Sequence, residues 1–249
     1  IIKVGHFEVN ARRKLGDGGF GVVFRAIDQS AVPPLQCAGK HLKLRSKQDI
    51  QAVQHEVNVL RKVANHPSVI ELYGYEEIDG SSAGKREAWL FMELATGGEL
   101  FDRLIDSGNL TEKATWPYAK ALLDGIMHCH EKGVIHRDIK LENIMLCADD
   151  PGNVKLIDFG LAHILPLGAD GKPVDEKLYE PVGTKSYRAP EIATATKSGY
   201  YGPGVDVWSI GIVIFSLVSG FFPLEEAKPS DWRYAKLAQV VILPSPPST

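Results

Sequence analysis

Residues 134–146 place a polar run between two apolar runs, and this arrangement constrains the fold more than any other part of the chain. Val134 and Ile135 precede the polar run, Leu146 closes it, and Asp138 and Asn143 lie within it. A buried strand–loop–strand carries such a run at its exposed turn. Because Asp138 and Asn143 are separated by five positions, one short loop can direct a carboxylate and an amide into the same cleft.

A second carboxylate follows a short distance along the chain. The apolar run at residues 154–157 ends in Asp158, which is followed by Phe159 and Gly160. Carboxylate and amide oxygens suit Mg²⁺, which usually takes only one or two protein carboxylates together with phosphate oxygens. The two loops therefore predict a site for Mg²⁺ and a phosphate-bearing ligand.

Three motifs in this order resemble the catalytic core of a eukaryotic protein kinase of the serine/threonine type. Each motif alone is weak, but their order and spacing together are specific. They are His136-Arg137-Asp138 with Asn143, then Asp158-Phe159-Gly160, then Ala189-Pro190-Glu191. The resemblance extends from about Phe7 to Leu237. It is nearest to the calcium/calmodulin-dependent kinase group, as the run from Gly97 to Asp102 also indicates.

The resemblance implies an α+β, two-lobed protein-kinase fold. A small antiparallel β-sheet lobe with one helix is expected over residues 1–95, where ATP binds. A larger, mainly helical lobe is expected over residues 96–249, with the catalytic loop and the activation segment. Together they form a single protein kinase domain. The family's last helices are missing, and with them the arginine that usually pairs with Glu191, so the C-terminus looks truncated.

A glycine-rich turn at residues 16–21 joins two predicted strands within residues 7–28. Glycines let the backbone approach a ligand closely, and free N–H groups in such a turn can hold phosphates. A strand rather than a helix follows the turn. This argues against a dinucleotide-binding fold and agrees with the phosphate-covering loop of kinases.

Lys40 lies in a predicted strand at residues 37–42, and a predicted helix follows at residues 49–64 with Asp49 as its cap. The resemblance implies that Lys40 holds the first two phosphates of the nucleotide and that Glu56 pairs with Lys40, with Glu71 as the alternative partner. The family more often has a β-branched residue in place of Gly39. Glycine weakens strand preference, so the rigidity of this strand stays open.

Two further strands are predicted at residues 69–77 and 87–92, joined by a surface loop at residues 80–84. Adenine is expected on backbone groups of Glu93 and Ala95, with Met92 as gatekeeper at the back of the pocket. Val23, Ala38 and Met145 would pack against the two faces of the adenine base. The alternative is that these three apolar residues are ordinary core residues. The implied ATP-binding residues are Leu15, Gly16, Gly18, Gly21, Val23, Ala38, Lys40, Met92, Glu93, Ala95, Glu99, Met145 and Asp158.

The resemblance also assigns roles in phosphoryl transfer. Asp138 is the expected base, Lys140 neutralises charge on the transferred group, and Asn143 and Asp158 hold Mg²⁺. Lys140 indicates serine/threonine rather than tyrosine specificity, and Thr184 is expected to bond both Asp138 and Lys140. The implied catalytic set is Asp138, Lys140, Lys40, Glu56, Asn143 and Asp158. Asp206 is expected to tie a buried helix to the catalytic loop, or to act as a simple N-cap.

The activation segment contains an acidic residue, Glu180, at the usual place of a phosphothreonine. We expect Glu180 to meet Arg137 and partly to replace that phosphate, against the alternative of a solvated loop charge. Tyr179, Thr184 and Ser186 are other candidate phosphosites. The loop at residues 160–182 is long and rich in Gly, Pro and Asp, which is typical of a mobile segment.

Glu99 and Glu142 border the expected peptide groove. They suggest a preference for arginine three residues before the target hydroxyl. The preference is expected to be loose, because Ser216 stands where the family has a second acidic site.

Composition narrows the remaining function classes. The formal net charge of the 249 residues is −3, which does not favour binding to nucleic acid or to an anionic membrane. Three scattered cysteines fit a reducing compartment. No signal peptide opens the chain, and the apolar run at residues 207–218 is too short to span a bilayer. His128-Cys129-His130 lacks the spacing of structural zinc ligands, so a helix face is preferred to a metal site.

The predicted function is therefore an ATP- and Mg²⁺-dependent protein serine/threonine kinase in the cytoplasm, also allowed in the nucleus. Protein substrates are its expected partners. Calmodulin is not supported by the visible sequence. A catalytically weak or inactive kinase-fold binding module, or a truncated fragment, is the alternative.

Overall fold

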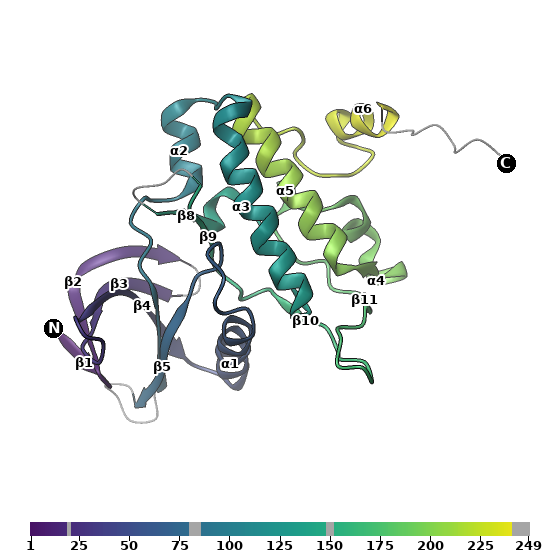
Figure 1. The fold of residues 1–249 in the computed structure, drawn as a ribbon. Coiled ribbons are helices and arrows are strands. Elements are labelled where there is room, and N and C mark those ends of the chain that lie inside the picture. Colours follow the sequence, from purple (N-terminus) through teal and green to yellow (C-terminus); the bar gives the residue numbers. More distant parts are fainter. Residues whose placement is uncertain (19–20, 80–85, 148–151, 241–249) are drawn as a thin grey trace.

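The computed structural model describes residues 1–18, 21–79, 86–147 and 152–240. An antiparallel sheet with one helix occupies one end of the molecule, and the helices α2, α3 and α5 occupy the other (Figure 1). Two predicted features, the tip of the glycine-rich turn and the loop at residues 80–84, lie outside the described residues, as does the tail after residue 240. The expected protein-kinase arrangement of a sheet lobe and a helical lobe is confirmed.

The sheet has six strands in the order β1-β2-β3-β4-β6-β5, with antiparallel pairing throughout. Its strands are β1 (Ile2–Val4), β2 (Phe7–Gly18), β3 (Gly21–Asp28), β4 (Leu35–Leu44), β5 (Leu72–Asp79) and β6 (Arg86–Glu93). The predicted hairpin at residues 7–28 corresponds to β2 and β3. Val69, expected in a strand, instead lies before β5 and forms an isolated bridge to Leu156.

Aromatic packing explains Gly39, which replaces the β-branched residue usual in the family. Phe7 and Phe91 stack with ring centroids 3.7 Å apart in the core of the sheet. A Cβ added at Gly39 would meet the Phe91 ring at 3.1 Å and Trp89 at 3.5 Å. Gly39 remains within β4, paired to Phe24 on one side and Phe91 on the other. The strand is therefore regular, and the small residue makes room for the aromatic pair.

Helix α1 (Lys47–Lys62) begins earlier than predicted, and its cap is Ser46 rather than Asp49. The Ser46 hydroxyl accepts the N–H of Asp49 at 3.1 Å, and the Asp49 carboxylate accepts the N–H of Ser46 at 2.8 Å. This reciprocal pair is a capping box, which satisfies two backbone donors at once. The predicted apolar face is buried, as Val53, Val57 and Leu60 show. Glu56 is carried on the same buried side.

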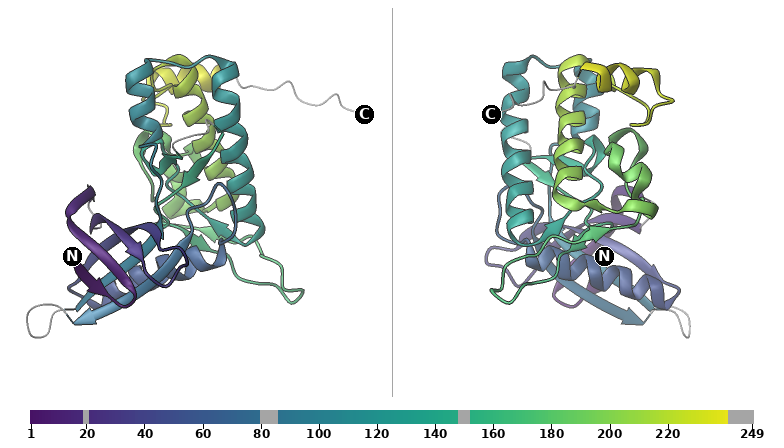
Figure 2. Two further views of the ribbon diagram at one scale, coloured as in Figure 1. Left: turned by 60° about the vertical axis from the view of Figure 1, so that its left-hand side comes forward. Right: turned by 90° about the vertical axis from the view of Figure 1, so that its right-hand side faces the viewer.

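The helical part is built on α2 (Leu100–Ser107), α3 (Glu112–Glu131) and α5 (Gly202–Ser219), which run side by side (Figure 2). The short α4 (Ala195–Ser198) lies beside α5, and α6 (Trp232–Val240) lies beyond it (Figure 1). The run at residues 207–218 was expected to be too short to span a bilayer, but the whole of α5 is long and apolar enough to do so by length and composition alone. Its buried residues, including Ile210, Val213 and Leu217, belong to the main hydrophobic core together with Leu122 of α3. The helix therefore serves here as a core element.

Short strands and 3₁₀ turns shape the loops between these helices. The pairs are β7 (Val134–Ile135) with β10 (His163–Ile164), β8 (Ile144–Leu146) with β9 (Val154–Leu156), and β11 (Lys177–Leu178) with β12 (Tyr200–Tyr201). The 3₁₀ turns are Leu141–Asn143, Lys185–Tyr187 and Pro190–Thr194. The predicted strand–loop–strand at residues 134–146 is thus present as β7, a turn and β8.

The segment at residues 160–182, expected to be a mobile loop, contains regular contacts. It carries β10 and β11, and between them Val174 N–H donates to Pro166 C=O at 2.9 Å. Gly168 N–H donates to Lys172 C=O at 2.8 Å, which closes the tip of the segment. The pairing with β7 and β12 anchors both ends of the segment beside the catalytic loop.

Candidate active site

In the loop between β7 and β8, the Asp138 carboxylate is contacted by Lys140 and by Thr184. Its Oδ2 lies 2.9 Å from Lys140 Nζ, and its Oδ1 accepts the Thr184 hydroxyl at 2.8 Å and the Thr184 N–H at 3.0 Å. Lys140 Nζ also donates to the Thr184 hydroxyl at 3.1 Å. The predicted contacts of Thr184 with both residues are therefore confirmed. They tie the activation segment to the catalytic loop.

Asp138 is held in its ionised form. Burial alone would raise its pKa, but hydrogen bonds from Lys140 and Thr184 and the nearby positive charge of Lys140 hold the pKa below its usual value. Hydrogen bonds to the charged form of a carboxylate favour that form. Asp138 is thus an acceptor at neutral pH, able to orient a hydroxyl group that approaches it.

Asp206 fixes the backbone of this loop from α5. Its carboxylate is fully buried and accepts the N–H of His136 at 2.9 Å and of Arg137 at 2.8 Å. The His130 ring lies 2.9 Å from the same carboxylate. The N-cap of α5 is Tyr201, so Asp206 is not a simple helix cap, and its predicted tie to the catalytic loop is confirmed.

Asn143 and Asp158 offer the oxygen donors predicted for a cation. The Asn143 amide nitrogen donates to the Asp138 carbonyl at 2.9 Å, which leaves the amide oxygen to face another partner. Asp158 has a φ of 58°, a left-handed conformation rare for a residue with a side chain. Ile157 N–H, next to Asp158, donates to the Asn143 carbonyl at 3.0 Å, so the two residues come from adjoining backbone.

This donor set fits Mg²⁺. One carboxylate and one amide oxygen match a hard cation that takes few protein ligands and fills its remaining positions with water and phosphate. Within the described residues, no three His, Cys, Asp or Glu side chains gather into a metal cluster. His128 and His130 instead lie against Val63 C=O and Asp206, as expected for a helix face.

The Lys40–Glu56 pair links β4 to α1. Lys40 Nζ lies 2.7 Å from Glu56 Oε1, and their side chains are only 11% and 8% exposed. Glu71, the alternative partner, accepts the N–H of Asn65 at 2.9 Å. The predicted pairing is therefore confirmed. Because both groups are largely removed from water, each depends strongly on the other.

Sheet register brings the predicted nucleotide-binding residues together. Val23 pairs with Gly16 on β2 and with Lys40 on β4, and Ala38 pairs with Met92 on β6. Met145 on β8 forms a β-bridge with Glu99, just beyond residues 93–95, which are the hinge between the sheet and the helices. Leu15, at the start of the glycine-rich turn, is 46% exposed. Gly18 ends β2, and Gly21 begins β3.

The hinge contains a buried ion pair that the sequence argument missed. Lys155 of β9 lies 2.8 Å from the Glu93 carboxylate, and its side chain is 10% exposed. Glu93 N–H donates to Glu71 C=O at 2.9 Å, which ties this end of β6 to the residue before β5. The available signal was a lone lysine within the apolar run at residues 154–157. Gly97 and Gly98 bind the hinge to Leu146 through two further backbone hydrogen bonds.

Arg137 meets Glu180, as predicted. Arg137 Nη1 lies 2.8 Å from Glu180 Oε2, and Arg137 Nε donates to Leu161 C=O at 2.7 Å. Hydrogen bonding and the positive charge of Arg137 hold the pKa of Glu180 below its usual value. Tyr200 OH donates to the Glu180 carbonyl at 3.0 Å, which fixes the backbone of the same residue.

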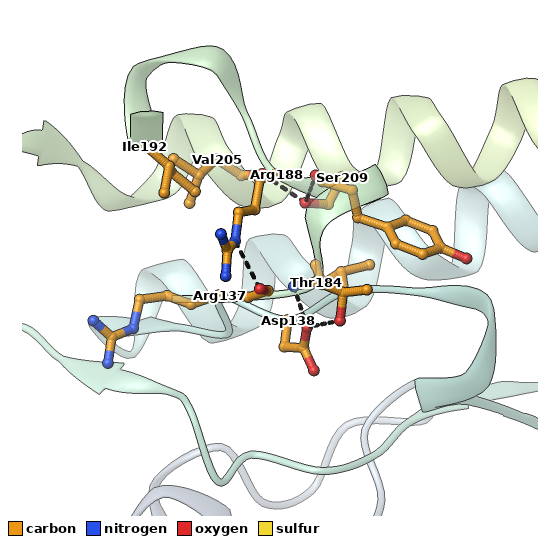
Figure 3. Close-up of a pocket in the computed structure, with 10 residues that line it drawn as sticks. Arg137, Asp138, Thr184, Arg188, Ile192, Val205 and Ser209 are labelled. Atoms are coloured by element: carbon orange, nitrogen blue, oxygen red, sulfur yellow. Dashed lines mark hydrogen bonds between the residues drawn. The ribbon is translucent and has the colours of Figure 1, made fainter. Parts of the chain in front are cut away.

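The three other phosphosite candidates differ in accessibility. Tyr179 is 53% exposed, Ser186 is half-buried, and Thr184 is occupied by Asp138 and Lys140. Figure 3 shows Thr184 beside Asp138, and the Arg188 side chain extending toward the loop that carries Arg137 and Asp138.

The acidic residues of the expected peptide groove lie near one another. Burial, and then the negative charges of Asp102 and Glu142, raise the pKa of Glu99. Glu142 accepts the Tyr187 hydroxyl at 3.2 Å. Ser216 is fully buried in α5, so its position offers nothing to a peptide at the surface.

Glu191, whose usual arginine partner in the family is missing from the sequence pattern, is exposed rather than buried. It therefore does not carry the cost of burying a carboxylate. A Cβ added at Gly204 of α5 would meet its carboxylate at 3.8 Å.

The comparisons agree with this geometry. The model of the protein kinase domain matches residues 9–246. CBL-interacting protein kinase 24 of Oryza sativa subsp. japonica is 35% identical over 90% of this chain and 46% of its own length. Calcium-dependent protein kinase 10 of Arabidopsis thaliana is 38% identical over 85% of this chain and 36% of its own length. This chain belongs to the protein kinase domain family, and it spans about half or less of the length of these relatives.

Proposed function

We propose that this chain transfers the γ-phosphate of ATP to serine or threonine hydroxyls of proteins. The observation that carries the proposal is the ionised Asp138 carboxylate, held by Lys140 and Thr184 next to Asn143. A relative with serine/threonine-protein kinase in its name, CBL-interacting serine/threonine-protein kinase 24 of Arabidopsis thaliana, is 34% identical over 90% of this chain. We assign ATP binding to residues 1–95 and catalysis to residues 96–249.

In this mechanism Asp138 orients the substrate hydroxyl and accepts its proton. Lys140, 2.9 Å from Asp138, offsets negative charge on the phosphoryl group as it moves. Phosphoryl transfer passes through a loose transition state. The protein therefore catalyses it mainly by positioning the reactants and stabilising charge, with little covalent chemistry of its own. The proton acceptor must lie within hydrogen-bond reach of the hydroxyl, and the contacts with Thr184 hold Asp138 in one orientation for that purpose.

The nucleotide is bound between the sheet and the catalytic loop. Lys40, fixed by Glu56, holds phosphate oxygens, and the Glu93 carbonyl with the Ala95 backbone recognises adenine. Val23, Ala38, Met92 and Met145 provide the apolar surfaces, as in most small-molecule sites. Asn143 and Asp158 hold Mg²⁺, which neutralises phosphate charge when bound. The remaining implied contacts are Leu15, Gly16, Gly18, Gly21 and Glu99.

Glu180 acts as a built-in substitute for an activating phosphate. It supplies a negative charge to Arg137 at 2.8 Å without any modification. A carboxylate carries less charge and fewer acceptor oxygens than a phosphate. The contact therefore supports a basal activity that needs no upstream kinase. Tyr179, Thr184 and Ser186 remain candidate phosphosites.

Substrates with arginine three residues before the target fit the acidic side of the groove. Glu99 and Glu142 lie close enough for their charges to interact, and a guanidinium would relieve that repulsion. Because Ser216 adds no second acidic site, the preference is moderate.

The test is transfer of labelled γ-phosphate from Mg-ATP to a serine peptide with arginine three residues upstream. We expect transfer by the native chain, a weaker reaction with threonine and none with tyrosine. Asp138→Asn and Asp158→Ala should each lower the rate by at least about 100-fold, as for loss of a group that acts on the transferred phosphoryl. A protein that melts cooperatively but transfers nothing would contradict the proposal and favour a kinase-fold binding module.

A further inference from the structure

A pocket of about 330 Å³ lies beside the activation segment, apart from the nucleotide site. Its lining combines an apolar floor with charged residues at its edge. The apolar residues are Pro181, Ala189, Ile192, Ala193 and Ala227, and the charged residues are Arg188, Glu226 and Lys228. This composition suits a side chain with a short aliphatic stem and a charged end.

The pocket adjoins the catalytic carboxylate. Arg188 and Ile192 line both this pocket and a smaller one whose wall includes Asp138 and Thr184. Pro181 follows Glu180 directly, and three positions further along, Thr184 bonds Asp138. In Figure 3 the Arg188 guanidinium points toward the loop that carries Arg137 and Asp138. A peptide whose hydroxyl reaches Asp138 would therefore place a neighbouring residue at the pocket.

The charged edge is positive overall. Glu226 lies 2.5 Å from Lys228, and the positive charges of Lys185 and Arg188 also act on its carboxylate. Three cations thus surround one anion. Arg188 donates through Nε to Gly183 C=O at 2.7 Å, and a guanidinium carries five N–H donors in all. Lys228 already pairs with Glu226, so Arg188 supplies the charge that a further carboxylate would meet at this edge.

Two groups of charges of opposite sign border the expected groove. Glu99, Asp102 and Glu142 are close enough to interact and form a negative group. Lys185, Arg188 and Lys228 act together on Glu226 and form a positive group. Complementary charge fixes the register and the partner of a bound chain more than it adds raw affinity.

We propose that the pocket lined by Arg188 and Lys228 binds a glutamate side chain of the substrate, one or two residues after the target hydroxyl. The proposal deepens the proposed function and rests on it, because the arginine expected near Glu99 sets the direction of the peptide. The glutamate methylenes lie on Ala189, Ile192 and Ala227, and its carboxylate meets Arg188 and Lys228. The pocket shares Arg188 and Ile192 with the wall that includes Asp138, so residues next to the target hydroxyl are the ones placed to reach it.

The test measures peptide binding, so that it does not depend on turnover. Fluorescein-labelled peptides carry arginine three residues before the target, alanine at the target, and either glutamate or glutamine one or two residues after it. Fluorescence anisotropy then gives Kd for each peptide with the native chain. We expect the better glutamate peptide to bind about three- to tenfold more tightly than its glutamine match, with the ratio falling at high salt.

Variants connect this preference to the pocket. Lys228 is 46% exposed, so Lys228→Gln should fold normally and reduce the preference, and Lys228→Glu should abolish or reverse it. Lys113→Glu, the same charge change at an exposed position of α3, should leave the preference unchanged. Equal Kd values for glutamate and glutamine peptides, or a preference insensitive to Lys228, would overturn the proposal.

Serine versions of the same peptides separate the two proposals. Phosphorylation of both peptides at equal kcat/KM, with equal Kd, would leave the kinase function standing and remove the pocket's role. A binding preference that depends on Lys228, without any phosphorylation, would support the pocket and contradict the kinase function.

Discussion

The Arg137 guanidinium lies 2.8 Å from the Glu180 carboxylate, with 7% of the Arg137 side chain exposed and 68% of the Glu180 side chain exposed. A largely buried cation on the catalytic loop thus depends on an exposed anion on the activation segment. The contact joins segments that are 43 residues apart in sequence. It gives a direct test of phosphate-independent activity.

Glu180→Gln should lower kcat by about three- to tenfold, because the amide cannot neutralise Arg137 and the activation segment loses a charged anchor. The peptide phosphorylation assay measures this. Asp175→Asn, which changes an exposed carboxylate on the same segment, is the matched control and should keep full activity. Unchanged kcat in Glu180→Gln would show that the carboxylate is only a solvated loop charge.

The same contact predicts a pH dependence of stability. The pKa of Glu180 is held below its ordinary value in the fold. Its stabilising contribution is therefore complete above the unfolded pKa of about 4.3 and is lost as pH falls through the lower folded pKa. The Tm difference between the native chain and Glu180→Gln should be constant from about pH 6 to 8 and should shrink below about pH 4. A difference that instead grows on acidification would contradict this.

Glu56→Gln should reduce kcat/KM by about tenfold or more, because Lys40 loses the partner that directs it toward phosphate. It should also destabilise the sheet lobe by up to about 3 kcal/mol, since the mostly buried Lys40 side chain loses its counterion. Glu71→Gln is the matched control, because Glu71 binds the Asn65 backbone and not Lys40. Equal losses in both variants would argue against a specific role for the Lys40–Glu56 pair.

Gly39→Val should lower stability by about 1–3 kcal/mol, although the family often has a β-branched residue there. The reason is the Phe91 ring, 3.1 Å from the position of an added Cβ. Thermal melting measures the loss. In the background of Phe91→Leu, which is itself destabilising, the added cost of Gly39→Val should fall. Additive losses in the double variant would show that Phe91 is not the obstacle.

Ser46→Ala should lower Tm by about 2–4 °C, which corresponds to about 1 kcal/mol for loss of an N-cap in a domain of this size. The Ser46 hydroxyl accepts the Asp49 N–H at the start of α1, the helix that carries Glu56. Ser230→Ala, at an exposed serine before α6, should leave Tm unchanged. A Tm loss of the same size in both would place the effect outside the cap.

Local patterns were enough to predict the main elements and the pairing of several site residues. The polar run between Val134 and Leu146 identified the catalytic loop, because an apolar–polar–apolar sequence has few ways to bury its ends. Lys40, Glu56, Asp138 and Thr184 followed from the resemblance, and the structure brings each expected pair within hydrogen-bond distance. The start of α1 was placed incorrectly, because both Ser46 and Asp49 are good capping residues and only the backbone geometry distinguishes their positions.

Other features depend on contacts between distant segments, which no local pattern contains. Lys155 could be identified as a partner of Glu93 only after β9 was seen beside the hinge. The need for glycine at position 39 arises from Phe91, which is 52 positions away in the chain and adjacent across the sheet. One pocket beside the activation segment brings Arg188 together with Lys228, although Arg188 precedes α5 in the sequence and Lys228 follows it. The sequence by itself determined the family, the elements and the chemistry of the catalytic loop, since these depend on residue type and spacing. Only the tertiary structure decided which charges meet and which side chains share space, because packing and ion pairing are set by distance in the fold.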